Sequence, residues 1–175
     1  MRFSRFDHVC MAHALRLAGK GLFTTHPNPR VGCLIADDGR ILGSGWHRIA
    51  GGPHAEILAL REAGAAARGA TAYVTLEPCS HHGKTAPCVD ALIEAGVTRV
   101  VIAAMDPNPL VNGDGMTRLK AAGITCESGL MSTEAGNLNA GFFKRMREGL
   151  PWVRVKTAVS LDGRTALTNG ISKWI

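Results

Sequence analysis

Three short motifs, far apart in the sequence, constrain the fold of this chain more than any other feature. They carry one imidazole, two thiols and one carboxylate, on His54, Cys79, Cys88 and Glu56. A catalytic zinc ion takes three nitrogen or sulfur ligands from the protein and leaves its fourth position to water. A carboxylate that is not a ligand then moves the protons. A fold that uses this set must bring three separate segments together around one ion.

The residues around His54 and Glu56 indicate the start of a helix. Pro53 sets the first helical position ahead of the periodic run 54–66, so both side chains are expected in the first helical turn. Residues two apart do not share a helix face. His54 can therefore hold the metal while Glu56 points toward a substrate.

The two cysteines lie where a thiolate is favoured. Cys79 follows the strand-like run 72–77, and Cys88 opens a helical run over residues 88–95 that Gly96 ends. The N-terminus of a helix favours negative charge, and a thiol there or beside a metal is acidified to the thiolate that binds. We therefore expect both cysteines to be ligands.

The order of the expected elements favours a layered α/β fold. Ser4 can cap a first helix, and two paired strands then flank a turn with the sequence Asp-Asp-Gly-Arg. Strands that alternate with helices form a sheet with crossover connections. The expected helices are 5–18, 54–66, 88–95, 115–122 and 132–147, and the expected strands are 31–36, 41–46, 71–77, 99–104 and 124–127. Residues 152–160 are expected to form a further strand.

Charge and cysteine content limit the class of protein. The net charge is +6, but the basic residues are scattered except at 144–147, so a phosphorylated metabolite explains the charge as well as RNA does. Five cysteines are an odd number, and no secretory leader or apolar run of about 20 residues is present. We expect a cytoplasmic protein without a nucleic-acid or membrane partner.

The motifs also resemble a known family. His54-Ala55-Glu56 matches the zinc nucleobase deaminase signature, in which the glutamate is the general acid and base, although eight residues rather than two separate the cysteines. With that insertion, residues 75–88 resemble the deaminase domain of the bifunctional riboflavin-biosynthesis deaminase/reductase family. Segments 27–32, 106–109 and 156–163 resemble other signatures of the same family, so the resemblance covers almost the whole chain.

The resemblance implies a fold and a reaction. The fold is a cytidine-deaminase-like three-layer α/β/α domain around a central mixed five-stranded sheet, over residues 1–149, and residues 150–175 begin a truncated reductase domain. The reaction is the hydrolytic deamination of 2,5-diamino-6-ribosylamino-4(3H)-pyrimidinone 5′-phosphate with one zinc ion per chain. NADPH would serve only the full-length protein, with Lys156 as a cofactor contact. A homo-oligomer is implied as well.

Roles for the remaining polar residues follow partly from their chemistry. Glu56 is expected to take a proton from the attacking water, pass it to a ring nitrogen and later protonate the departing amine. Substrate contacts are expected from an amide between two prolines, a strand-end histidine, the inserted loop and the loop after strand 99–104. These residues are Asn28, His47, His81, Lys84, Asp106 and Asn108.

Two alternatives remain open. One is another zinc deaminase that acts on cytosine, guanine or tRNA adenosine, although such relatives generally keep two residues between the cysteines. The other is a non-catalytic zinc-binding module, which would gain nothing from the carboxylate of Glu56.

Overall fold

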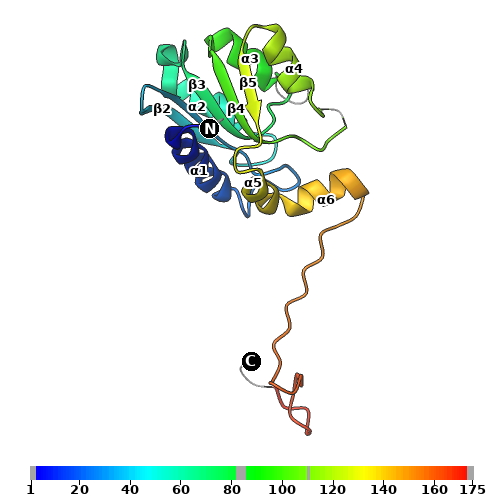
Figure 1. Cartoon of the computed structure of the whole chain (residues 1–175). Helices are drawn as coiled ribbons and strands as arrows, with labels where there is room; N and C mark the ends of the chain where they lie inside the picture. Colours follow the sequence, from blue (N-terminus) through cyan, green and yellow to red (C-terminus); the bar gives the residue numbers. More distant parts are fainter. Residues whose placement is uncertain (1–2, 82–85, 110, 173–175) are drawn as a thin grey trace.

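A mixed five-stranded sheet forms the centre of the molecule (Figure 1). The computed structural model describes residues 3–81, 86–109 and 111–172. The strand order is β2-β1-β3-β4-β5, and β1 is antiparallel to both of its neighbours while β3, β4 and β5 are parallel. The strands are β1 Gly32–Asp37, β2 Arg40–Trp46, β3 Thr71–Leu76, β4 Arg99–Ala104 and β5 Thr125–Ser128. The predicted mixed sheet is confirmed.

Helices cover both faces of the sheet and complete three layers. Side chains of β1 alternate between the two faces, as a half-buried strand requires: Cys33 and Ile35 belong to the core cluster that includes residues of α2, α3 and α4, whereas Leu34 and Ala36 belong to the cluster that includes residues of α1, α5 and α6. The helices are α1 Arg5–Gly19, α2 Ala55–Ala63, α3 Cys88–Ala95, α4 Asp114–Ala121, α5 Ser132–Leu138 and α6 Ala140–Glu148, with the short 3-10 helix η1 Gly64–Ala67 after α2. No helix in the described part of the chain is long and apolar enough to cross a membrane.

Two glycines of β2 allow α2 to lie unusually close to the sheet. A Cβ atom on Gly45 would lie 2.4 Å from the carbonyl oxygen of Ala55, and one on Gly43 would lie 2.2 Å from that of Ala59. Real side chains do not tolerate such separations, so the close contact requires glycine. The start of α2 is thereby held in one position against the strand.

The expected single helix 132–147 was wrong, because the structure has two helices. The break falls at Asn139, whose backbone is not helical (φ −114°, ψ 24°). The buried side chain of Asn139 accepts a hydrogen bond from the Arg30 amide and donates one to the Arg30 carbonyl, each at 2.8 Å. These tertiary bonds hold the chain at the break, and α6 leaves in a new direction.

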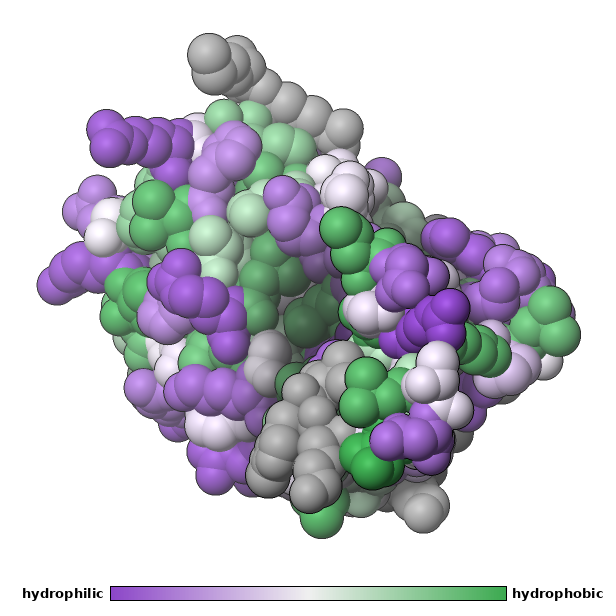
Figure 2. All heavy atoms as spheres, turned by 90° about the horizontal axis from the view of Figure 1, so that it is seen from below, coloured by the Kyte–Doolittle hydropathy of each residue, from purple (hydrophilic) through white to green (hydrophobic). Residues whose placement is uncertain are grey.

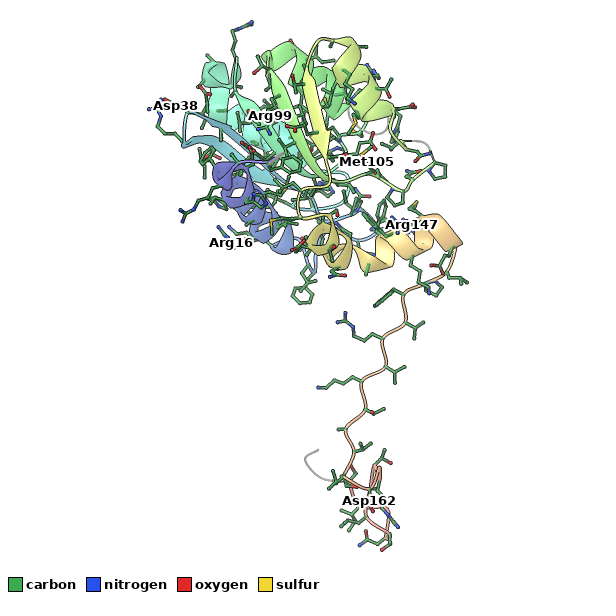
Figure 3. The ribbon with its side chains drawn as sticks, viewed as in Figure 1. Arg16, Asp38, Arg99, Met105, Arg147 and Asp162 are labelled. Atoms are coloured by element: carbon green, nitrogen blue, oxygen red, sulfur yellow. The ribbon has the colours of Figure 1, made fainter. Side chains whose placement is uncertain are left out.

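The expected strand 152–160 was also wrong. Residues 151–160 are extended and exposed, but they pair with no strand in the part of the chain that the structure describes. A strand requires a neighbour to satisfy its backbone groups. After α6 the chain runs away from the domain toward Asp162 (Figures 1 and 3). From that side, hydrophobic residues lie exposed beside hydrophilic ones (Figure 2).

Candidate active site

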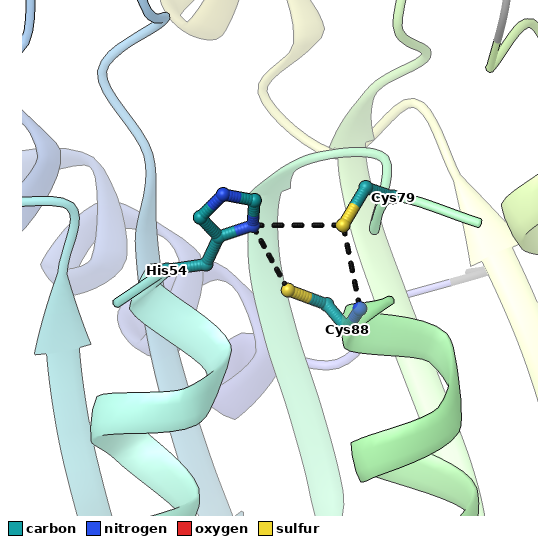
Figure 4. Close-up of side chains that lie close together, drawn as sticks. All are labelled: His54, Cys79 and Cys88. Atoms are coloured by element: carbon teal, nitrogen blue, oxygen red, sulfur yellow. Dashed lines mark hydrogen bonds between the residues drawn. The ribbon is translucent and has the colours of Figure 1, made fainter. Parts of the chain in front are cut away.

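The three candidate ligands converge at one end of the sheet (Figure 4). His54 is the N-cap of α2, one residue before the helix begins, Cys79 follows β3, and Cys88 is the first residue of α3. His54 Nδ1 lies 3.5 Å from Cys79 Sγ and 3.1 Å from Cys88 Sγ, and all three atoms lie within 4.8 Å of one another. Tetrahedral zinc separates its nitrogen and sulfur ligands by about 3.6 Å. The set therefore fits one zinc ion.

The charge state of the two thiols also fits a cation. Hydrogen bonds from Cys88 and His54 lower the pKa of the Cys79 thiol to about 4, against the opposing effect of burial. One of these bonds comes from the Cys88 amide at the N-terminus of α3, 3.3 Å from Cys79 Sγ. The neighbouring Cys79 sulfur, together with burial, raises the pKa of the Cys88 thiol far above its usual range. Two thiolates this close require a positive charge between them.

Glu56 lies beside the ligands without joining them. It is 3% exposed, and it lines the same cavity as His54 and Cys79. Burial and the negative charge at Cys79 raise the pKa of Glu56 to about 7. A carboxyl group with a pKa near neutrality both accepts and donates protons at physiological pH. Its position and its pKa suit an acid and base rather than a metal ligand.

A cavity of about 470 Å³ opens over His54 and Cys79. Of the residues expected to contact a substrate, the structure brings five to this cavity: Asn28, His47, His81, Asp106 and Asn108. Lys84 lies outside the described residues. Lys156 is exposed on the stretch after α6 and is not among the residues that line the cavity. The volume suits a small molecule.

Asn28, His47 and the carbonyl group of Pro53 form a chain of hydrogen bonds that ends next to His54. His47 Nδ1 lies 3.1 Å from the carbonyl oxygen of Pro53, which can only accept, so Nδ1 carries the proton. His47 Nε2 is then an acceptor, and Asn28 Nδ2 donates to it at 3.0 Å. Burial lowers the pKa of His47 and favours this neutral form. Both ring nitrogens of His47 thus have a hydrogen-bond partner, and the bond to Nε2 fixes the orientation of the Asn28 amide.

Glu77, to which sequence reasoning gave no role, holds the loop after β4. Its carboxylate is 4% exposed and accepts hydrogen bonds from the backbone amides of Asp106 at 3.3 Å, Gly113 at 3.0 Å and Met116 at 3.2 Å. The loop it holds supplies Asp106 and Asn108 to the cavity. Burial raises the pKa of Asp106 to about 6. The Thr-Leu-Glu-Pro-Cys motif placed Glu77 in the sequence, but only its backbone partners reveal its role.

One wall of the cavity was not expected from the sequence. Phe142, Arg145 and Met146 of α6 line it, at positions i, i+3 and i+4 of the helix. Their neighbour Phe143 points the other way and is buried in the core. The basic run 144–147 was the only signal in the sequence, and it does not say which of its members faces a cavity.

Comparison with known proteins identifies the class of the domain. Residues 4–104 match the family model described as "Cytidine and deoxycytidylate deaminase zinc-binding region". The chain is 62% identical over 169 residues to "Riboflavin biosynthesis protein RibD" of Escherichia coli, which covers 97% of this chain and 46% of that protein. It thus spans about half the length of the curated relatives of this kind that it matches.

A shorter relative matches along its whole length. "Diaminohydroxyphosphoribosylamino-pyrimidine deaminase" of Buchnera aphidicola subsp. Schizaphis graminum is 53% identical over 145 residues, which are 83% of this chain and 99% of that protein. Among solved structures, Acinetobacter baumannii RibD is 55% identical with a TM-score of 0.92, over 98% of this chain and 48% of that one. The Thermotoga maritima deaminase/reductase is 43% identical with a TM-score of 0.93, over 97% of this chain and 49% of that one.

Proposed function

Because this chain belongs to the riboflavin-biosynthesis branch of the zinc-binding cytidine and deoxycytidylate deaminase family, we propose that it removes the 2-amino group of 2,5-diamino-6-ribosylamino-4(3H)-pyrimidinone 5′-phosphate by hydrolysis. One observation carries the proposal. The Buchnera relative, whose name describes this deaminase, aligns with this chain over 99% of its own length. The metal set and the buried Glu56 supply the chemistry that the reaction requires.

His54, Cys79 and Cys88 would hold the zinc ion. When bound there, the ion lowers the pKa of a coordinated water to about 7 and so supplies a nucleophile at neutral pH. Glu56, a buried carboxyl group that lines the cavity beside the ligands, would accept a proton from the attacking water and deliver it to the ring nitrogen beside the attacked carbon. It then carries the second water proton to the amino group. The carbon–nitrogen bond breaks, and a ring carbonyl and ammonia remain.

Asn28 would orient the ring. Its Nδ2 donates to His47, so its carbonyl oxygen is the group left to accept a hydrogen bond from a ring N–H or amino group. His47 would act through Asn28 rather than on the substrate. Asp106, Asn108 and His81 line the same cavity and would contact the ring or the sugar phosphate.

The division of the chain is part of the same proposal. Residues 1–149 would form the deaminase domain, and residues 150–175 would begin a reductase domain in which Lys156 contacts NADPH. The proposal rests on the longer relatives, of which this chain covers less than half. A cytoplasmic homo-oligomer is the corresponding proposal for the assembled protein.

Ammonia release by the zinc-loaded protein tests the function. The ribotide phosphate is assayed beside cytidine, guanine and adenosine-containing tRNA under the same conditions. Selective turnover of the ribotide is the expected result. Turnover of another substrate instead would assign the chain to a different deaminase, and zinc binding without any turnover would indicate a non-catalytic module.

A further inference from the structure

The cavity wall formed by α6 carries a single permanent cation. Among the described residues that line the cavity, Arg145 is the only arginine or lysine, and the buried carboxyl groups of Glu56, Glu77 and Asp106 line it as well. Arg145 is exposed, and among the described residues its guanidinium makes one long hydrogen bond, 3.5 Å from Nη2 to the carbonyl oxygen of Pro27. An arginine has five N–H donors. Most of the donors of Arg145 therefore remain for a ligand.

The position of α6 is fixed by contacts outside the cavity. Asn139, between α5 and α6, is 4% exposed and binds both the amide and the carbonyl of Arg30 at 2.8 Å. The Arg30 guanidinium donates to the carbonyl of Leu138 at the end of α5. Because Arg30 lies two residues after Asn28, this contact ties the ring-orienting loop to the helix that carries Arg145. The hydrogen bonds between Asn139 and Arg30 thus hold the Asn28 amide and the Arg145 guanidinium in one arrangement.

The packing of α6 decides which basic residue faces the cavity. Phe143 is buried in the core, and the Arg147 guanidinium lies 5.1 Å from the centre of its ring. Lys144 pairs with Glu148 at 3.4 Å. Arg145 lies on the face shared with Phe142 and Met146, which lines the cavity. Of the basic run 144–147, the fold thus turns one cation toward the substrate.

We propose that Arg145 binds the 5′-phosphate of the substrate and so selects the ribotide over the same compound without phosphate. This inference rests on the proposed deaminase function. Arginine forms charge-assisted, often paired hydrogen bonds with phosphate oxygens, and these are stronger than neutral ones. Arg145 lines the same cavity as the metal site and reaches Pro27, the residue before Asn28, so its guanidinium stands where it can meet a phosphate carried by a ring that Asn28 orients. His81 also lines the cavity and can share the contact.

The test compares Arg145→Ala with Lys144→Ala, which removes the same charge one position away from the cavity. With the ribotide, Arg145→Ala is expected to lower kcat/KM about 10- to 100-fold, mainly through KM, while Lys144→Ala leaves it unchanged. With the dephosphorylated compound, both variants should equal the wild type. Arg145→Lys should restore part of the loss, because it keeps the charge but not the paired geometry. Equal losses on both substrates, or no loss on the ribotide, would overturn the proposal.

A binding measurement separates this inference from the proposed function. Calorimetry with ribose 5-phosphate needs no turnover, and the affinity of Arg145→Ala should be at least about 10-fold weaker than that of the wild type. If the wild type did not deaminate the ribotide but showed this difference, the proposed function would fail and the anion contact would stand. If the ribotide were deaminated but ribose 5-phosphate bound equally to both proteins, the Arg145 contact would fail alone.

Discussion

Both ends of the parallel strands β3 and β4 carry buried ionisable groups. At one end these groups are paired with opposite charges or hydrogen-bond donors of the protein, and at the other end some of them are not. Arg99 and Met105 mark the two ends of β4 in Figure 3. At the amino end, Asp7 accepts hydrogen bonds from Tyr73 Oη and Arg99 Nη1, both at 2.7 Å, and Arg99 Nη2 reaches Glu127 at 2.6 Å. Every carboxylate there has its cation or donor within the protein.

At the carboxyl end of the strands, the described residues supply no cation that neutralises the ionisable groups at the metal site. Glu56 has a pKa raised to about 7, and the thiols of Cys79 and Cys88 cannot both ionise without a cation between them. Burial of ionisable groups alone would not distinguish the two ends. The groups that lack a counter-charge, and that face a cavity, mark the functional end. Substitutions at the two ends should therefore separate activity from stability.

The largest effect is expected for Glu56→Gln. The amide keeps the shape of the side chain but cannot carry protons, so turnover should fall by about 10³-fold or more. Zinc content should stay equal to that of the wild type because Glu56 is not a ligand. Stability should be unchanged or higher, since a buried carboxyl group is removed. Glu94→Gln, on an exposed position of α3, is the control. Loss of zinc in Glu56→Gln would contradict the assignment.

At the opposite end, Asp7→Asn should lower stability and leave the chemistry intact. It removes a buried partner of Arg99 and the side chain that completes the capping box of α1 with Ser4. Because Arg99 is 26% exposed and keeps Glu127 as a partner, we expect a loss of about 1–3 kcal/mol, below that for a fully buried pair. Urea unfolding measures this loss, and the folded fraction should keep the wild-type kcat. A comparable fall in kcat would show that the two ends are not independent.

The same substitution should flatten one part of the pH profile of stability. Burial acts to raise the pKa of Asp7, but hydrogen bonds from Arg99 and Tyr73 outweigh it and hold the pKa well below its usual range. Because the unfolded carboxyl binds its proton near pH 4, the stabilisation is present above that pH and is lost as the pH falls further. Metal-free wild type should lose more stability than metal-free Asp7→Asn between about pH 5 and pH 3. Parallel curves would contradict this role.

A methyl group under α2 should produce an intermediate effect on both properties. In Gly45→Ala the new Cβ would lie 2.4 Å from the Ala55 carbonyl, so the start of α2 must move. We expect a loss of about 1–3 kcal/mol and a lower kcat, because His54 and Glu56 move with the helix. Gly19→Ala is the matched control, since a Cβ there meets nothing within 4 Å. Equal behaviour of the two variants would refute a positioning role for the close contact.

The smallest effect is expected for Glu77→Gln, which keeps the volume but replaces one acceptor by a donor that faces backbone amides. The loop that supplies Asp106 and Asn108 should loosen, and KM should rise about 10-fold with a smaller change in kcat. Glu94→Gln, an exposed position on α3, controls for the lost charge. A fall in kcat alone would mean that Glu77 acts on the reaction rather than on the loop.

The metal-binding part of the site could be predicted from the sequence because the residues next to each ligand determine its local structure. A proline before His54, a strand before Cys79 and a helix start at Cys88 are each set by neighbouring residues, and the structure places the three side chains together. The strand 99–104 and the helix 88–95 were predicted to the residue, since Gly96 ends the helix and the strand is a short apolar run.

The cavity wall away from the metal depends on contacts between distant segments, which cannot be read from neighbouring residues. The hydrogen bonds between Asn139 and Arg30 join residues 109 positions apart, and they divide one expected helix into two. The amide partners of Glu77 and the cavity face of Arg145 follow from that packing. The strand expected at 152–160 does not form. Its residues are typical of a strand, but the described part of the chain offers no neighbouring strand with which it could pair.

Ammonia release from the ribotide phosphate as a function of zinc content tests the central claim most directly. Metal-free protein is reconstituted in steps, and turnover is measured beside the bound zinc. The account predicts no turnover without metal and a linear rise that ends at one zinc ion per chain. Turnover that persists without zinc, or that stays absent at one ion per chain, would contradict it.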